Sequence, residues 1–364
     1  MKNTFGNNIS VTLFGESHGP MIGATVDGLP SGIKTDLEYI KACLKMRGAY
    51  GKISTARQEK DEPIIISGIF AGFTTGTPLT VLIENTSTSS KDYSELFDTP
   101  RPSHADYTAA VKYGEWRDYR GGGHFSGRIT AALVAVGAIL RSALEKKNIF
   151  IGTHISRLGG ISDRGFIEYA SDIDVLNSKF FPVLSDESAE LMYKRIEDVA
   201  KDGDSVGGVL ETAVIGIPAG VGEPWFDTLE GMISHAVFSI PAVKGVEFGS
   251  GFEIADMLGS DANDPFTTDG EKIFTSSNNN GGINGGISNG MPIVFRTAVK
   301  PTPSIYKEQK SVSISRKEER TLKIEGRHDP AIVHRARAVV DAVTAIALAD
   351  MLATKFGTDW LRDN

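Results

Sequence analysis

Apolar residues along this chain follow two patterns, one typical of strands and the other of helices. Short apolar or alternating runs predict strands, whereas longer stretches with a period of about 3.6 residues predict helices. The predicted strands cover residues 11–14, 21–28, 64–70, 79–85, 150–161, 207–216, 244–249 and 292–299. The predicted helices cover residues 35–46, 126–144, 185–201, 226–238 and 331–353.

Local signals sharpen three of these predictions. The TDLE sequence at 35–38 has the form of a capping box, which predicts that a helix begins there. The helix at 185–201 is amphipathic, and we expect Leu191, Ile196 and Val199 on its buried face. The polar stretch 259–275 has no periodicity and is expected to be a loop.

The order of these elements indicates the fold class. Strands occur in consecutive groups with long helices between them, which favours α+β over strictly alternating strands and helices. No repeat is evident, and the composition does not shift enough at any point to mark a domain boundary. We therefore expect one domain spanning residues 1–364.

Composition limits the possible functions. The chain has 364 residues, 40% of them hydrophobic and 23% charged, as in an ordinary soluble protein. The net charge of -8 argues against a nucleic-acid partner. Its one cysteine, Cys43, excludes an intrachain disulfide, and the scattered histidines match no metal motif, so no metal is expected. No signal peptide and no apolar run approaching about 18 residues are evident, which predicts a cytoplasmic protein without membrane contact.

The densest candidate chemistry lies between residues 101 and 128. This stretch contains two histidines, His104 and His124, several arginines, and a run of three glycines ahead of the long apolar helix. A glycine-rich turn leading into a helix N-terminus presents free N–H groups to an anion, and arginine binds phosphate or carboxylate bidentately. The alternative is a surface turn with solvated charges.

The pentapeptide GESHG at 15–19 matches the G-x-S-x-G motif of serine hydrolases. That motif requires a helix after the serine, whereas a proline and a predicted strand follow here, so a hydrolase is disfavoured. The turn instead presents Ser17 and His18 as donors, with His18 a candidate general acid. A histidine merely satisfied within the turn fits the sequence equally well.

Three other loops add anion-binding chemistry. Arg47, Lys52 and Arg57 recur in a glycine-rich loop, which is either a second wall of an anion pocket or a solvated surface. The glycine-rich segment 278–290 leads into a strand and then the KPTPS sequence at 300–304, where backbone N–H groups and polar side chains form a possible phosphate nest. Together with Asp329 as a proton-transfer group, these residues indicate an enzyme acting on a phosphorylated or carboxylated small molecule.

Several long motifs, in order along nearly the whole chain, resemble the chorismate synthase family. They are GESHGPMIGATVDGLPSG at 15–32, RPSHADYTAAVKYGEWRDYRGGG at 101–123, SIPAVKGVEFGSGF at 239–252, GGINGGISNG at 281–290, KPTPSI at 300–305 and GRHDP at 326–330. The resemblance implies a β-α-β sandwich of antiparallel sheets and long helices. It also implies anti-1,4-elimination of phosphate from 5-enolpyruvylshikimate 3-phosphate, giving chorismate. Reduced FMN is the implied cofactor, NADPH a possible reductant, and a homotetramer the implied assembly.

The resemblance also assigns roles to residues. It implies that His18 protonates or binds the departing phosphate, that His104 contacts the reduced flavin near N1 and O2, and that Asp329 acts near the flavin N5. The implied substrate-binding residues are Ser17, Arg47, Lys52, Arg57, Arg128 and Arg327. The implied flavin-binding residues are His124, Phe125, Ser126, Pro241, Ala242, Gly285, Lys300, Pro301, Thr302, Pro303, Ser304 and Arg327.

The sequence departs from the family pattern at a few of these positions. Met46 and Lys52 stand where arginine is usual, Pro241 stands where many members have asparagine, and residues 124–130 read HFSGRIT in place of RSSARET. These changes predict less charge at the anion wall and at the flavin loop, and so weaker binding. The alternative to an active enzyme is a diverged relative that binds an anion without this catalysis or acts on another ligand.

Overall fold

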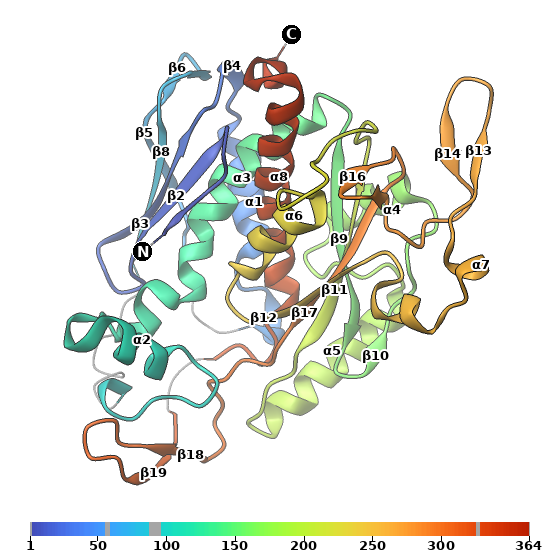
Figure 1. The fold of residues 1–364 in the computed structure, drawn as a ribbon. Helices are drawn as coiled ribbons and strands as arrows, with labels where there is room; N and C mark the ends of the chain where they lie inside the picture. Colours follow the sequence, from blue (N-terminus) through green and yellow to red (C-terminus); the bar gives the residue numbers. More distant parts are fainter. Residues whose placement is uncertain (1, 55–58, 87–95, 325–327, 364) are drawn as a thin grey trace.

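Two five-stranded antiparallel sheets enclose a layer of helices (Figure 1). The computed structural model describes residues 2–54, 59–86, 96–324 and 328–363. The first sheet has the order β1 (Thr4–Phe5), β2 (Ser10–Gly15), β3 (Met21–Asp27), β8 (Leu79–Glu84) and β5 (Pro63–Ser67). The second has the order β10 (Ile161–Ser162), β9 (Phe150–Leu158), β11 (Gly208–Ile215), β17 (Ile293–Val299) and β12 (Val243–Phe248).

The helices between the sheets form the middle of the core. Helix α3 (Thr130–Glu145) packs on β3 and β8, whereas α8 (Val333–Phe356) packs on β9 and β11, and the two helices pack on each other. Alternate residues of β8, among them Leu79, Val81 and Ile83, are fully buried toward this layer. The arrangement confirms the predicted α+β class and the β-α-β sandwich.

The other helices lie around this core. They are α1 (Leu37–Arg47), α2 (Asp106–Tyr113), α4 (Tyr169–Ser178), α5 (Asp186–Lys201), α6 (Leu229–Phe238) and α7 (Gly259–Ala262). Small sheets join β4 (Ser31–Lys34), β7 (Phe73–Thr75) and β6 (Ile69–Phe70); β13 (Phe266–Thr268) and β14 (Ile273–Thr275); β15 (Ile283–Asn284) and β16 (Ile287–Ser288); and β18 (Gln309–Val312) and β19 (Glu319–Leu322).

Three sequence predictions about these elements were wrong in detail. Helix α1 is capped by Asp36, whose carboxylate accepts the N–H groups of Glu38 and Tyr39 at 3.0 and 3.1 Å; the hydroxyl of Thr35 makes no such bond. In α5 the side chain of Leu191 is 49% exposed, because the buried face runs through Met192 and Ile196, four residues apart. The segment 259–275 contains α7 and the β13–β14 hairpin, which projects from the body (Figure 1).

One helical segment has the length and composition of a membrane span. The stretch Gly127–Glu145 is long and apolar enough to resemble a span, although no such run was expected from the sequence. However, 89% of it is buried inside the protein. Because α3 packs between a sheet and α8, its apolar surface on both sides follows from a central position in the core.

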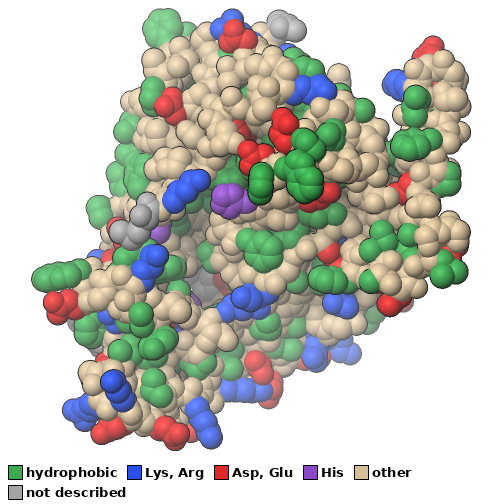
Figure 2. Space-filling view, viewed as in Figure 1, with side chains coloured by type: hydrophobic (Ala, Val, Ile, Leu, Met, Phe, Trp, Pro, Cys, Tyr) green, Lys and Arg blue, Asp and Glu red, His purple; other side chains and the backbone are tan. Residues whose placement is uncertain are grey.

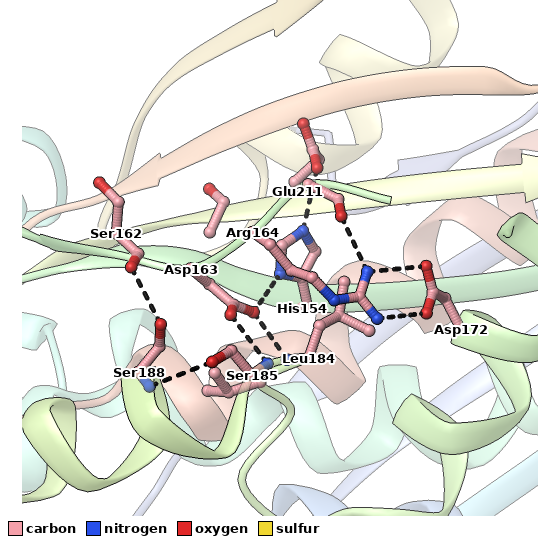
Figure 3. Close-up of polar contacts among 12 residues, drawn as sticks. His154, Ser162, Asp163, Arg164, Asp172, Leu184, Ser185, Ser188 and Glu211 are labelled. Atoms are coloured by element: carbon pink, nitrogen blue, oxygen red, sulfur yellow. Dashed lines mark hydrogen bonds and ion pairs between the residues drawn. The ribbon is translucent and has the colours of Figure 1, made fainter. Parts of the chain in front are cut away.

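A cluster of charged residues lies on the face of the second sheet that points away from α8 (Figure 3). His154 on β9 stands opposite Glu211 on β11, and its two ring nitrogens lie 3.0 Å from Asp163 and 2.9 Å from Glu211. Asp163 also accepts the N–H groups of Leu184 and Ser185, at the start of α5. Burial alone would lower the pKa of His154, but the hydrogen bonds to both carboxylates outweigh it and raise that pKa.

Replacing His154 with glutamine is therefore expected to destabilise the protein by about 3–5 kcal/mol near pH 5.5, as for other broken buried ion pairs. Because the pKa of His154 is raised in the folded protein, its contribution to the free energy of unfolding is complete below the unfolded-state pKa of about 6.5. That contribution is lost as the pH rises through the folded-state pKa. Urea unfolding of both proteins at about pH 5.5, 7 and 9 measures the difference. A difference in unfolding free energy that does not shrink with rising pH would contradict this role.

Candidate active site

A cleft of about 1420 Å³ opens where the two sheets and the helical layer meet. The N-terminus of α3, the C-termini of α1 and α6, the start of α8 and the segment after β17 line it. Figure 2 shows a hollow with histidine and basic side chains around it. Predicted site residues that line the cleft are Arg47, His104, His124, Phe125, Ser126, Arg128, Pro241, Ala242, Lys300, Thr302, Pro303, Ser304 and Asp329.

None of the other predicted site residues that the structure describes lines the cleft. Ser17 and His18 lie behind Gly121, which lines the cleft. Pro301 packs against Gly207 instead of the cleft. Gly285 lies at the opposite end of α6 from the cleft, so this chain alone does not bring it to the site and its flavin contact stays a prediction. Arg57, Arg327 and the side chain of Lys52 fall outside the described part of the chain.

His18 is fixed by the turn between β2 and β3. The Oγ of Ser17 lies 2.8 Å from Nδ1 of His18 and donates to the carbonyl of Gly121 at 3.2 Å. With the hydroxyl donating to that carbonyl, Oγ accepts from Nδ1–H of His18, so this contact places a proton on Nδ1. His18 is 8% exposed, so this imidazole is held in one orientation rather than solvated.

The glycine run passes between the two histidines that the sequence analysis singled out. A Cβ on Gly121, whose φ is +57°, would lie 2.3 Å from Cε1 of His18. A Cβ on Gly122 would lie 3.1 Å from Cε1 of His104. Side chains at these positions would displace the imidazoles, so the glycines are required by close approach as well as by backbone conformation.

His104 is oriented by a carboxylate. Its Nδ1 lies 2.7 Å from Oδ1 of Asp106, and Asp106 also accepts two bonds from the guanidinium of Arg101 at 2.7 and 2.8 Å. Burial would raise the pKa of Asp106, but the bonds from Arg101 and His104 hold it well below its usual range. An ionised Asp106 accepts the Nδ1 proton, so Nε2 of His104 is the nitrogen left for a ligand.

Two predicted substrate arginines converge on one carboxylate. Asp61 accepts from Nη1 of Arg47 at 3.0 Å and from Nη1 of Arg128. Arg47 also donates to Thr130 and to the carbonyl of Gly127, both at 2.9 Å. Burial lowers the pKa of Arg47 to about 10 although Asp61 opposes it, so the guanidinium stays charged near neutral pH.

Asp329 is tied to the same group of charges. It pairs with Arg335 at the start of α8, and Nε of Arg335 donates to the carbonyl of Arg47 at 2.9 Å. The neighbouring His328 lines the cleft, and burial followed by the charge of Arg101 lowers the pKa of its imidazole. The cleft therefore holds a neutral histidine beside the carboxylate that the resemblance places near the flavin.

Sequence reasoning missed several charged residues of the cleft. Asp106, two residues after His104 and five after Arg101, was detectable as a short-range partner for both. Asp61 carries no comparable signal, because Arg128 lies 67 residues away and Asp61 stands in the charged run EKDE at 59–62. The contact of Arg335 with the carbonyl of Arg47 likewise joins residues far apart in the chain.

One departure from the family pattern does not affect the cleft. Met46 lines a separate cavity of about 140 Å³ between α1, α3 and α8, beside Cys43. The expected loss of charge from the anion wall at Met46 is therefore wrong, because the side chain of residue 46 faces the core. His124 remains in the cleft, where its Nδ1 lies 2.7 Å from the carbonyl of Gly15, so the loop after the glycine run contacts the end of β2.

The fold and the cleft define a class of protein: an α+β enzyme with oriented imidazoles and several guanidinium groups around a space for anionic small molecules. The chorismate synthase family model matches residues 9–353. Chorismate synthase of Thermococcus gammatolerans is 47% identical, covering 95% of this chain and 96% of its own length. That of Methanobrevibacter smithii is 46% identical, covering 96% of each.

A solved structure agrees with the sequence comparisons. A crystal structure of a chorismate synthase superimposes with a TM-score of 0.73 at 29% identity, covering 97% of this chain and 94% of that one. The chain belongs to the chorismate synthase family. Its activity is that of a carbon–oxygen lyase of the shikimate pathway, which makes chorismate and phosphate from 5-enolpyruvylshikimate 3-phosphate.

Proposed function

We propose that the cleft binds reduced FMN beside the substrate and carries out the anti-1,4-elimination with His18, His104 and Asp329 as proton-handling groups. The observation that carries this proposal is the placement of His18 and His104 on either side of the glycine run at a cationic cleft. The cleft volume of about 1420 Å³ supports two ligands, since pockets for one drug-sized ligand measure about 300–1,000 Å³.

The residues present fit a flavin mononucleotide. The segment Thr302–Ser304, Pro241 and Ala242 lie on one wall with basic side chains, and the hydroxyl of Thr302 is buried without a hydrogen-bond partner among the described residues. When bound, reduced FMN supplies electron density to the substrate and accepts the ring proton. His104, held by Asp106, donates or accepts a proton at Nε2 toward that wall.

The substrate side of the cleft is the Arg47–Arg128 wall. Each guanidinium is held by Asp61 and by backbone carbonyls, so the pair is preorganised for carboxylate or phosphate groups. His18, when it is protonated as an imidazolium, gives the proton on Nε2 to the departing phosphate and keeps the proton on Nδ1 that Ser17 accepts. Roles for Ser17, Lys52, Arg57 and Arg327 in substrate binding, and for Arg327 and Gly285 in flavin binding, stay predictions from the resemblance.

We further infer a cytoplasmic homotetramer without nucleic-acid or membrane partners, with NADPH as a possible source of flavin reduction. Large exposed side chains support subunit contacts, among them Phe70 at 78% and Phe226 at 96% exposure. The net charge of -8 supports the absence of a nucleic-acid partner.

Anaerobic conversion of 5-enolpyruvylshikimate 3-phosphate with chemically reduced FMN tests the proposal. Chorismate absorbance and phosphate release are expected to rise together, and His18→Ala and His104→Ala are each expected to lower kcat by about 10²–10⁴-fold. Unchanged turnover in both variants would contradict their roles. Absent turnover at saturating flavin, with the substrate still bound, would instead support the diverged anion-binding protein.

A further inference from the structure

One guanidinium group joins two walls of the cleft. Nη1 of Arg335 pairs with Asp329, and Nε of the same side chain donates to the carbonyl of Arg47 at 2.9 Å. That carbonyl belongs to the last residue of α1, where a helix has no intrahelical donor for it. All three residues line the cleft. Arg335 therefore uses two edges of one planar group to tie Asp329 to the substrate wall.

The position of this arginine in α8 runs against helix electrostatics. Arg335 lies in the first turn of α8, and that turn contains no acidic residue to offset its charge. The partial positive charge of a helix N-terminus disfavours a cation there. Side chains that break such a local preference are expected mainly at functional sites, where a specific contact compensates for the cost. Here the compensating contact is Asp329, which precedes the helix.

The ion pair is shielded and lies beside the charge of Arg47. The side chains of Arg335 and Asp329 are 21% and 13% exposed, so the pair keeps one geometry more readily than a solvated surface pair. Burial is the main cause that lowers the pKa of Arg47, and the charges of Arg335 and Asp329 act on that pKa in opposite directions. Arg335 can therefore stand beside Arg47 while Asp329 is ionised.

We propose that Arg335 is a positioning residue of the elimination, which holds the carboxylate of Asp329 in a fixed place relative to Arg47. This inference rests on the proposed function, in which Asp329 handles a proton near the flavin and Arg47 binds the substrate. Asp329 lies in a segment without helix or strand, so its place depends on side-chain contacts such as that with Arg335. A displacement of about 1 Å at a reacting group lowers a rate by about a hundredfold.

A double-mutant cycle in the reduced-FMN assay of the full-length protein tests the proposal. Arg335→Gln is expected to lower kcat by about 10- to 100-fold, the effect of one charged hydrogen bond. In an Asp329→Asn background the same substitution should change kcat by less than about twofold, because a residue that acts through Asp329 then has no carboxylate to position. Arg335→Lys keeps the positive charge and is expected to recover part of kcat.

Arg296→Gln is the matched control. Nε of Arg296 lies 2.8 Å from Glu247, and Nη2 donates to the carbonyl of Ser250 at 3.2 Å. Arg296 thus also bridges one carboxylate and one backbone carbonyl, at a similar exposure of 25%, but it does not line the cleft. We expect Arg296→Gln to retain wild-type kcat, and thermal unfolding of both variants measures any loss of stability. An equal loss of kcat in Arg296→Gln would overturn the inference.

The other outcomes separate the inference from the proposed function. Equal effects of Arg335→Gln with and without Asp329→Asn would overturn the inference, because Arg335 would then act independently of Asp329. A kcat lowered by Asp329→Asn but unchanged in Arg335→Gln would also overturn it and leave the proposed function standing. Unchanged kcat in both single variants would overturn the proposed role of Asp329, and the inference with it. If Arg335→Gln does not fold, the same cycle with Arg335→Lys decides, since one ammonium group replaces two edges of the guanidinium.

Discussion

Replacing Gly121 with alanine is expected to lower kcat by at least about a hundredfold, because a displacement of about 1 Å at a catalytic group has that effect. The new methyl group would lie 2.3 Å from Cε1 of His18 and 2.5 Å from Oγ of Ser17, so the imidazole and its orienting hydroxyl must both move. Alanine also adopts the φ of +57° poorly, at a cost of about 1–2 kcal/mol.

Gly114→Ala separates these two causes. Gly114 has a similar φ of +66°, but no neighbouring atom lies within 4 Å of a Cβ built there. Because the ψ of Gly114 is −147° and that of Gly121 is 18°, alanine fits the backbone less well at Gly114. We therefore expect Gly114→Ala to lose at least as much stability as Gly121→Ala, and Gly121→Ala alone to lose turnover. Thermal unfolding and the reduced-FMN assay measure the two quantities. Near-normal turnover in Gly121→Ala would mean that His18 need not occupy the observed position.

The layered fold was predictable where burial repeats regularly along the chain. Strand β8 alternates buried and half-buried positions, and α3 is buried on nearly every side because it lies between a sheet and α8. The β13–β14 hairpin was not predictable in this way. Its strands have three residues each and project from the body, so their stability does not depend on a repeating buried face.

Likewise, one part of the candidate site could be predicted from the sequence and another part could not. His18 and His104 are close in sequence to Ser17 and Asp106, which orient them, so local patterns point to both histidines. The contact of Gly121 with His18, by contrast, joins two motifs that are 104 residues apart at Ser17 and Gly121. Asp61 is different, because Arg128 lies 67 residues away and only the folded chain brings both arginines to this carboxylate. The sequence predicted that both arginines bind the substrate, but it did not reveal that the carboxylate of Asp61 holds them in place.

Asp61→Asn is expected to destabilise the protein by about 3–5 kcal/mol, because the charges of Arg47 and Arg128 remain buried without a carboxylate. Asparagine suits this comparison, since Asp61 has a φ of +44° and asparagine adopts such conformations about as readily as aspartate. The substitution therefore changes the charge more than the backbone. Urea unfolding measures the loss, and Asp118→Asn, which breaks a partly exposed pair with Arg120, should cost at most about 1 kcal/mol.

Ligand binding distinguishes a carboxylate that positions the arginines from one that merely neutralises them. If Asp61 holds both guanidinium groups in place for the substrate, Asp61→Asn raises KM more than it lowers kcat. Inorganic phosphate should then stabilise the variant more than the wild type, because an anion that binds the folded state replaces the missing charge. Unchanged stability and KM would show that the bonds from Arg47 to Thr130 and from Arg128 to the carbonyl of Glu84 are sufficient to hold the pair.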